Sequence, residues 1–240
     1  MGVTFVTALY LPSTPIYRKL DAYISHFEEL ASTNIPIILH LDSRLVELGN
    51  HLCKKYSNIQ HCIYGILDTS YVPTDVILPY FRNKEKDTVD YLCIQLSKLK
   101  LMKDSEQLVK TTHMAWIDFG IFHMFKEKEL CRLWLNKIAF SSFKADKILS
   151  PSSYDMEYLK SLNHSFNSLH SVYWIHCGSL LLGPKDKFGP AYEAQMKAVR
   201  AHLPQLTWEV NYWVMIDEHF IRYSAIHSDI ILENVCQYLN

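Results

Sequence analysis

The pentapeptide Trp116-Ile117-Asp118-Phe119-Gly120 places a carboxylate at the end of an apolar run. A buried carboxylate loses its hydration, which is costly unless a cation or hydrogen-bond donors replace the water. A divalent ion that bridges Asp118 to a diphosphate would meet that cost and would activate a leaving group. The following glycine would let the backbone approach a ligand closely. The pentapeptide is equally compatible with an aspartate that caps the next helix.

Several well-known catalytic motifs are missing or incomplete. The segment from Gly178 to Gly183 opens like a phosphate-binding loop, but Pro184 follows where that loop needs its lysine. No G-x-G-x-x-G follows the first apolar run, no G-x-S-x-G occurs, and no H-E-x-x-H is present. These absences argue against a Walker-type ATPase, a nicotinamide enzyme, an elbow-type serine hydrolase and a zinc metalloprotease.

Strand and helix patterns alternate along the chain. Short apolar runs predict strands over residues 3–9, 35–43, 58–66, 113–123 and 171–182, the last as a strand pair or one bulged strand. Apolar residues at helical spacing predict helices over residues 17–30, 44–57, 83–104, 189–203 and 207–220. Residues 141–168 are expected to be irregular. This alternation predicts an α/β fold with a mostly parallel central sheet, whose strands point their carboxyl ends toward the ligand.

Length and composition limit the class of protein. The chain has 240 residues, 49% of them hydrophobic, and no repeat or linker divides it, so we expect one domain over residues 1–240. Lys and Arg number 24 against 25 Asp and Glu, so no basic excess attracts nucleic acid or an anionic membrane. Scattered cysteines, no signal peptide and no apolar run of about 20 residues predict a cytoplasmic protein without a transmembrane segment.

Stretches along most of the chain resemble the HtrL/YibB protein family. They are YLCIQLSKLKLM, HMAWIDFGIFH and WIHCGSLLLGP, with a Q-x-S-K stretch ahead of a W-x-D-x-G strand, and TFVTALY is similar to the family's opening strand. The resemblance runs from Val3 to about Phe220. It implies a nucleotide-diphospho-sugar transferase fold of the GT-A kind, similar to glycogenin-like glycosyltransferases. In such folds a D-x-D element binds Mn²⁺ and the sugar nucleotide, and Gly120 stands here in place of its second carboxylate.

The GT-A resemblance implies where the nucleoside of a donor would bind. Ala8, Leu9 and Tyr10 end the first predicted strand, which receives the base and ribose in that fold, and Tyr10 would stack on the base. Asp42 ends the second predicted strand and would accept hydrogen bonds from the ribose or the base. The alternatives are ordinary packing for Tyr10 and, for Asp42, a turn or helix cap before Arg44.

The same resemblance implies contacts to the diphosphate and the sugar. Lys98 of the Q-x-S-K stretch would place its ammonium near the diphosphate and offset the charge of the leaving group. The alternative is a solvated surface lysine. Gly178 would lie beside the donor sugar, because a residue without Cβ permits a close approach. His176, in the same apolar run, is otherwise interpreted as a core histidine.

Two carboxylates, Glu209 and Asp217, lie on one side of the aromatic helix predicted over residues 207–220. Aromatic rings beside carboxylates suit a sugar, which offers apolar CH faces and hydroxyl groups together. An inverting transferase needs a carboxylate that deprotonates the acceptor hydroxyl, for which Glu209 is the first candidate and Asp217 the second. Glycogenin-like enzymes use a late histidine as a metal ligand, which makes His219 a candidate. The alternative is that this stretch belongs to the core.

These observations predict a glycosyltransferase that moves a hexose or pentose from a nucleoside-diphosphate donor, with UDP as the expected nucleotide. The acceptor would be a glycan, a glycoprotein or another hydroxyl compound, and Asp118 would hold Mn²⁺ or Mg²⁺ against the diphosphate. One alternative is a metal-dependent phosphohydrolase or nucleotidyltransferase on a similar sheet. Another is a non-catalytic protein that binds nucleotides or carbohydrates.

Overall fold

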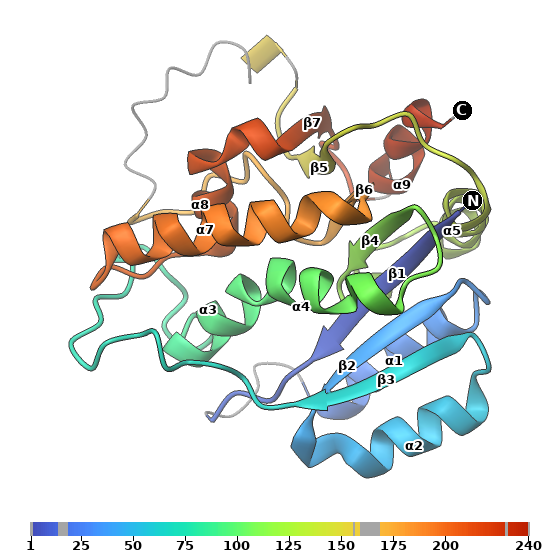
Figure 1. The fold of residues 1–240 in the computed structure, drawn as a ribbon, viewed down its shortest axis with the longest axis horizontal. Coiled ribbons are helices and arrows are strands. Elements are labelled where there is room, and N and C mark those ends of the chain that lie inside the picture. Colours follow the sequence, from blue (N-terminus) through green and yellow to red (C-terminus); the bar gives the residue numbers. More distant parts are fainter. Residues whose placement is uncertain (1, 14–18, 156, 159–168, 229, 240) are drawn as a thin grey trace.

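A seven-stranded sheet forms the centre of the computed structural model, which describes residues 2–13, 19–155, 157–158, 169–228 and 230–239 (Figure 1). The strands are β1 (Val3–Leu9), β2 (Ile37–Asp42), β3 (Ile59–Gly65), β4 (His113–Ile117), β5 (Ile148–Ser152), β6 (Leu180–Pro184) and β7 (Phe220–Ser224). They lie in the order β3-β2-β1-β4-β6-β5-β7. Neighbouring strands run parallel except at β6, which is antiparallel to both β4 and β5. The predicted α/β class with a mostly parallel sheet is confirmed.

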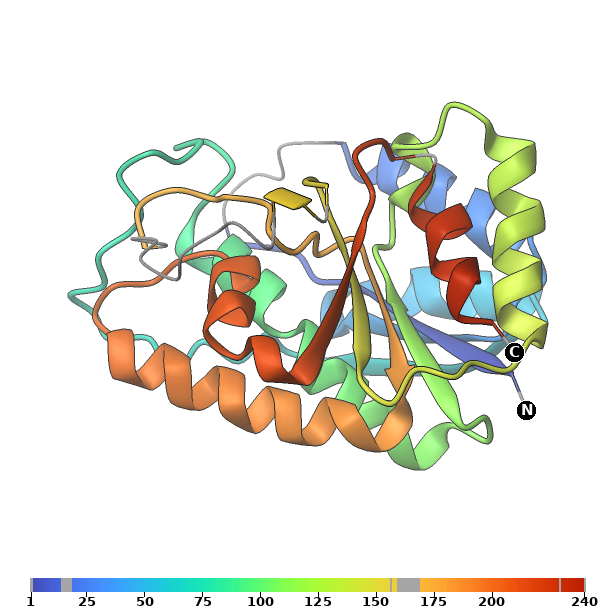
Figure 2. The ribbon, with the colours of Figure 1, turned by 90° about the horizontal axis from the view of Figure 1, so that it is seen from above.

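Helices cover both faces of this sheet (Figure 2). One layer holds α1 (Leu20–Ala31), α2 (Val46–Lys55), α5 (Lys128–Phe140) and α9 (Ile230–Val235). The other holds α3 (Val89–Leu96), α4 (Lys98–Ser105), α7 (Phe188–His202) and α8 (Glu209–Met215). Alternate side chains of β1 serve the two layers, because Phe5 packs into the first core and Val6 into the second.

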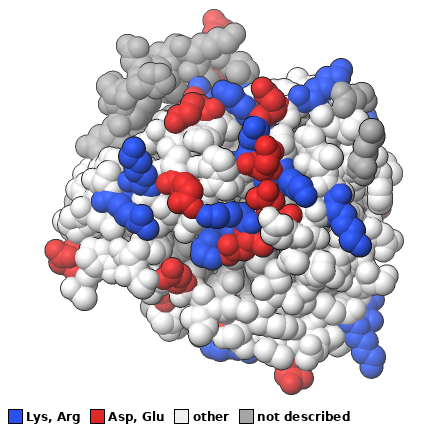
Figure 3. Space-filling view, in the orientation of Figure 1, with Lys and Arg blue, Asp and Glu red and all other residues white. Residues whose placement is uncertain are grey.

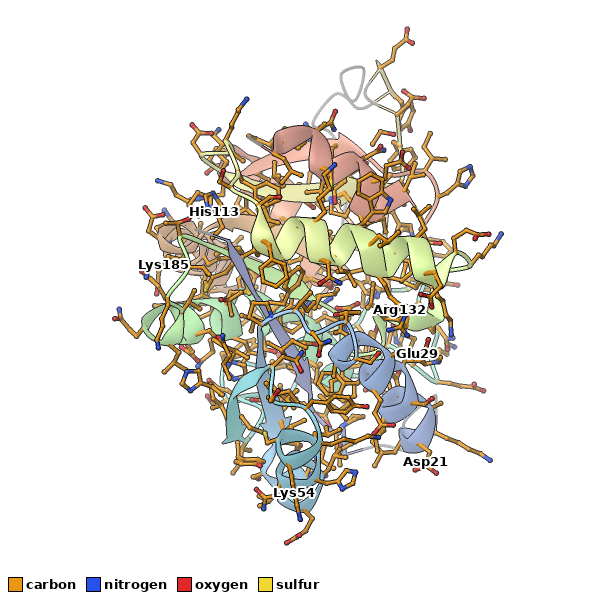
Figure 4. The ribbon with its side chains drawn as sticks, turned by 90° about the vertical axis from the view of Figure 1, so that its right-hand side faces the viewer. Asp21, Glu29, Lys54, His113, Arg132 and Lys185 are labelled. Atoms are coloured by element: carbon orange, nitrogen blue, oxygen red, sulfur yellow. The ribbon has the colours of Figure 1, made fainter. Side chains whose placement is uncertain are left out.

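Polar contacts join α1 and α5 at the edge of the first layer. Figure 4 shows Glu29 and Arg132 side by side, and Nη1 of Arg132 donates to the backbone carbonyl of Glu29 at 3.1 Å. Nζ of Lys128 lies 2.8 Å from the Glu29 carboxylate. Half-exposed ion pairs of this kind contribute about 0–1 kcal/mol, so the apolar core beneath them holds the helices on the sheet.

The helix predicted over residues 83–104 is two helices. Thr88 caps α3 by accepting a hydrogen bond from the backbone N–H of Tyr91 at 3.3 Å, so the helix begins at Val89. Ser97 separates α3 from α4, and its hydroxyl donates to the carbonyl of Ile94 at 2.7 Å. A serine that bonds back to the preceding turn competes with the helical ladder and favours such a break.

Other predicted boundaries differ from the structure in the second half of the chain. The strand predicted over residues 171–182 begins only at Leu180, while β5 lies in the region predicted to be irregular and β7 in no predicted strand. β5 includes Pro151, which lacks an N–H and obscures a strand pattern. Residues 17–18 of the first predicted helix and residues 159–168 lie outside the described residues.

The surface over α4 and α7 carries charges of both signs. Figure 3 shows acidic and basic side chains interspersed on this face, in line with the formal net charge of -1. Nζ of Lys100 lies 2.6 Å from Asp104, and Lys103 pairs with Glu193. Among the helices in the described part of the chain, none is long and apolar enough to cross a bilayer.

Candidate active site

A cavity of about 720 Å³ lies over the carboxyl ends of β1 and β4. Ala8, Leu9 and Tyr10 line it at the end of β1, and Trp116 and Asp118 line it at the end of β4. Other parts of its wall come from α3, the first residue of α4, the loop before β6, the start of α8, α1, the segment that follows β4, and the segment from the end of β7 into α9. Ligands of open α/β sheets bind outside the carboxyl ends of the strands. The cavity is therefore the candidate active site.

The ammonium of Lys98 joins three segments of chain at this cavity. Its Nζ donates to the carbonyl of Gly178 at 2.8 Å and to Oε1 of Glu209 at 3.0 Å, and it lies 3.2 Å from Oδ1 of Asp118. Two of these contacts are hydrogen bonds, and the contact with Asp118 is an ion pair. The Lys98 and Glu209 side chains are 4% and 5% exposed, whereas Asp118 is 38% exposed. We call Lys98, Asp118 and Glu209 the lysine–carboxylate cluster.

Electrostatics make the lysine–carboxylate cluster a cation-attracting site. Burial alone would lower the pKa of Lys98, but Asp118 and Glu209 beside its ammonium outweigh burial and hold that pKa above its ordinary value. One ammonium between two carboxylates leaves a formal charge of minus one. Such a site attracts a further cation and repels a diphosphate that arrives without one.

Asp118 has one engaged oxygen and one open oxygen. Oδ1 accepts a hydrogen bond from Nε1 of Trp116 at 2.8 Å and also faces Lys98. Oδ2 has no hydrogen-bond partner among the residues that the structure describes. Mg²⁺ sites in nucleotide-using enzymes combine one or two carboxylates with substrate phosphates and water. The open oxygen of Asp118 fits that kind of site.

A cation at Asp118 would depend on oxygens from a bound substrate. Within residues 2–13, 19–155, 157–158, 169–228 and 230–239, no three His, Cys, Asp or Glu side chains gather in a group that could hold a metal alone. Glu209 provides a second carboxylate, which shares a contact with Lys98. A divalent ion here would therefore bind together with a phosphate ligand.

Gly178 packs directly against the cluster. A Cβ atom at this position would lie 2.2 Å from Oε1 of Glu209 and 2.8 Å from Nζ of Lys98. Two backbone hydrogen bonds hold the glycine in place, from Cys177 N to the carbonyl of Pro151 at 2.7 Å and from Asp118 N to the carbonyl of Ser179 at 3.0 Å. The carbonyl of Gly178 points to Lys98 rather than into the sheet, which is why β6 begins only after it.

Asp217 is not on the helix that carries Glu209, contrary to the prediction. Helix α8 ends at Met215, and Asp217 opens a short 3₁₀ turn that ends at His219. Neither Asp217 nor His219 lines the cavity. The structure thus brings Glu209, but not these two residues, to the lysine–carboxylate cluster.

Asp217 instead contacts the buried His176. Nε2 of His176 lies 3.3 Å from Oδ1 of Asp217, and Nη2 of Arg222 lies 3.1 Å from Oδ2 of the same carboxylate. Nδ1 of His176 is 3.1 Å from the hydroxyl of Ser150. Burial lowers the pKa of His176 despite the neighbouring carboxylate. His176 is therefore a buried core histidine with polar partners.

Among the predicted nucleoside contacts, Ala8, Leu9 and Tyr10 line the cavity and Asp42 does not. The Asp42 carboxylate accepts hydrogen bonds from N and Nε of Arg44 at 3.0 and 2.8 Å and from N of Leu11 at 3.2 Å. These hydrogen bonds, that of Arg44 above all, lower the pKa of Asp42. The alternative predicted for Asp42, a cap before Arg44, is confirmed. Tyr10 is 8% exposed and separates this cavity from a second one of about 510 Å³ under α4.

Two exposed aromatic residues at the cavity were missed from the sequence. Phe81 comes from the segment between β3 and α3, and Trp174 from the loop before β6. Trp174 belongs to the WIHCG stretch that carries the family resemblance, which was a usable signal. Phe81 lies outside every predicted element, so no periodic pattern marked it.

Comparison with known proteins gives likenesses in structure alone. No protein-family model matches the chain, and no curated protein matches it in sequence. The resemblance to the HtrL/YibB family therefore stays a prediction.

Similar solved structures are nucleotidyltransferases and glycosyltransferases. The 4-diphosphocytidyl-2C-methyl-D-erythritol synthase of Anaerococcus prevotii has 11% identity and a TM-score of 0.48, with 95% of this chain and 89% of that chain covered. Mouse xyloside xylosyltransferase 1 has 11% identity and a TM-score of 0.41, with 93% and 85% covered. A cytidylyltransferase of Leptospira borgpetersenii has 10% identity and a TM-score of 0.45, with 95% and 78% covered. At these values the likeness says nothing of the chemistry at this cavity.

Proposed function

We propose that the protein is a glycosyltransferase that uses a nucleoside-diphosphate sugar together with a divalent cation. The observation that carries the proposal is the lysine–carboxylate cluster, which leaves one oxygen of Asp118 open in a cavity over the carboxyl ends of β1 and β4. The cavity volume of about 720 Å³ lies within the range of small-molecule sites.

The donor would extend across the cavity from β1 toward α8. The nucleoside would lie against Ala8, Leu9 and Tyr10, and the diphosphate would bind near the open oxygen of Asp118. A Mn²⁺ or Mg²⁺ ion held there would neutralise charge on the departing diphosphate. The contacts of Lys98 favour a positioning role, because its ammonium is buried and already binds the carbonyl of Gly178 and the carboxylates of Glu209 and Asp118.

Glu209 would act as the general base. In this proposal its carboxylate takes the proton of an acceptor hydroxyl while the acceptor oxygen bonds to the anomeric carbon and the bond from that carbon to the diphosphate breaks. The products are the glycosylated acceptor and the nucleoside diphosphate. Lys98 would hold the Glu209 carboxylate in one orientation, through the hydrogen bond of 3.0 Å from Nζ to Oε1.

The first test measures thermal stability with UDP-, GDP- and CDP-sugars, with and without Mn²⁺. Ligands that bind the folded state raise its apparent melting temperature. We expect Asp118→Asn to lose the Mn²⁺-dependent shift and to stay folded, since Asn keeps the shape of the side chain and loses its charge. Asp21→Asn, on an exposed helix residue, is the matched control. A wild-type shift in Asp118→Asn would contradict the proposal.

Product analysis separates the proposed activity from the alternatives. A glycosyltransferase releases the nucleoside diphosphate, a nucleotidyltransferase releases pyrophosphate from a nucleoside triphosphate, and a phosphohydrolase releases phosphate. We expect Glu209→Gln to reduce kcat by about 10²–10⁴-fold with donor affinity near wild type, because proton transfer occurs in the transition state. Full turnover in this variant would exclude Glu209 as the base.

A further inference from the structure

Trp174 lines the cavity, is half-exposed and has an unusual backbone conformation. The residue has φ = 52°, in the left-handed region that a bulky side chain rarely adopts, and 47% of it is exposed. The backbone N–H of Ser153 donates to the carbonyl of Trp174 at 3.2 Å, which fixes this conformation against the end of β5. A bulky residue in this conformation is strained, and such residues cluster at functional sites.

Phe81 presents a second exposed ring at the same cavity. It is 69% exposed and packs edge-on against Tyr80, with ring centroids 4.8 Å apart at 86°. Its backbone N–H donates to the carbonyl of His170 at 3.2 Å, so the segment that carries Phe81 is tied to the loop that carries Trp174. The two rings thus belong to adjoining segments that line one cavity. We call Phe81 and Trp174 the aromatic rim.

The loop that carries Trp174 is attached at one end to α8 and at the other end to Lys98 of the lysine–carboxylate cluster. Nδ2 of Asn211 in α8 donates to the carbonyl of Ser171 at 2.9 Å, and Lys98 binds the carbonyl of Gly178 at 2.8 Å. Helix α8 begins with Glu209. A ligand on the rim would therefore be held at a fixed position relative to Glu209, as an acceptor must be for proton transfer.

We propose that the aromatic rim binds a saccharide acceptor, whose apolar CH face lies on Trp174 with Phe81 beside it. This inference rests on the proposed function, and it names the acceptor class. Polar residues accompany the rings along the cavity wall, namely Asn83, Lys86 and Asp87 after Phe81. Rings in one cavity wall with charged and amide side chains match the two-sided chemistry of a sugar, which combines apolar CH faces with hydroxyl groups. A lipid surface would require a continuous apolar patch without these groups.

The experiment uses the full chain and a panel of methyl α- and β-glycosides of glucose, galactose, mannose and xylose. Saturation-transfer NMR would report which sugar protons contact the protein. We expect wild type to saturate the CH protons of one sugar face for at least one glycoside. Trp174→Ala and Phe81→Ala should each weaken that binding about tenfold, as the loss of one ring contact implies. Phe140→Ala removes an equally exposed ring, 70% exposed on α5, and should change nothing.

Donor binding in the same variants separates this proposal from the proposed function. UDP-sugar thermal shifts and slow hydrolysis of the donor by water should stay within about twofold of wild type in Trp174→Ala, because the rim is assigned to the acceptor alone. If wild type bound no nucleotide sugar, the proposed function would be refuted, and glycoside binding would then be judged by itself. The rim proposal is overturned if wild type binds no glycoside in the panel, or if both rim variants bind as wild type does. Co-sedimentation with phosphatidylcholine vesicles, lost in the same variants while glycoside binding persists, would assign the rim to a lipid instead.

Discussion

Gly178 is the residue at which the three segments of the lysine–carboxylate cluster come closest. Its φ is not in the left-handed region, so the requirement for glycine is one of space. Gly178 lines the cavity and comes close to the carboxylate of Glu209 and the ammonium of Lys98, and its approach to a donor sugar stays a prediction. The size of this one position therefore determines whether the ion pair can form.

The first prediction is that Gly178→Ala separates Glu209 from Lys98. An added Cβ 2.2 Å from the Glu209 carboxylate must displace it, at a cost of about 1–3 kcal/mol for overpacking. We expect a lower unfolding midpoint in urea and, if the proposed function is right, a loss of glycosyl transfer. The control is Gly189→Ala in α7, where the nearest atom to a new Cβ is 3.9 Å away and the helix should gain up to about 1 kcal/mol. Equal stability of the two variants would contradict the close contact.

The role of a single residue could be predicted from the sequence where a polar residue stands at an unexpected position in an apolar pattern. Asp118 could be predicted to line a site because a charged residue follows an apolar strand. The pairing of Lys98 with Glu209 could not, because 111 positions separate them and no local pattern links them. Asp217 was misplaced because the aromatic periodicity continues past the end of α8.

At the scale of elements, Gln195 joins three helices behind the cavity. Its side chain is fully buried in α7, and its Nε2 donates to the carbonyl of Leu96 in α3 at 2.8 Å. Its Oε1 accepts from Nε1 of Trp213 in α8 at 2.7 Å. One amide thus satisfies a carbonyl at the end of α3 and an indole in α8, both inside the core.

The second prediction is that Gln195→Leu leaves both of these polar groups without a partner. Each buried unsatisfied group costs about 1–3 kcal/mol. The free energy of unfolding should therefore fall several times more than it does for an ordinary surface substitution. Urea unfolding of the variant measures the loss. Gln107→Leu, at an exposed position, should stay within about 0.5 kcal/mol of wild type. If Gln195→Leu unfolds at the wild-type midpoint, the amide does not hold the helices together.

Elements with strong periodicity were predicted well, and those defined by distant partners were not. β1 to β4 are apolar runs that can be recognised alone, and α7 has a clear helical pattern. β5 and β7 pair with each other over five residue pairs, and β5 also pairs with β6, so all of their strand partners are distant in the sequence. Short strands of mixed composition depend on such tertiary pairing more than on propensity.

At the scale of the whole molecule, buried histidines make stability depend on pH. His40 is 2% exposed, and its Nε2 lies 2.8 Å from the hydroxyl of Ser105. Burial lowers the pKa of His40 from 6.5 to about 4, and burial also lowers the pKa of His176. As the pH falls below 6.5, these histidines therefore bind protons in the unfolded chain before they do so in the folded chain, and stability falls.

The third prediction concerns this pH dependence. A pKa lowered from 6.5 to about 4 corresponds to about 3 kcal/mol of stability lost between those pH values. His40→Gln removes the titrating group, so its free energy of unfolding should fall less than that of wild type over the same interval. Urea unfolding at pH 6.5 and at pH 4 gives both values. His61→Gln, at an exposed position, should retain the wild-type slope, and a His40→Gln slope equal to wild type would show that His40 does not set it.

The sheet order has a consequence for how the chain emerges from the ribosome. β1, β2 and β3 lie within the first 65 residues and can pair as soon as they are made, but β1 also pairs with β4 through Val3 and His113, 110 positions apart. Until β4 has been synthesised, β1 is an open edge of almost entirely buried residues, which is a template for misassociation. Glu209 arrives about a hundred residues later still. The nascent chain thus carries an unprotected apolar edge from the time β1 is made until β4 is made, and the cavity of the candidate active site can form only after that.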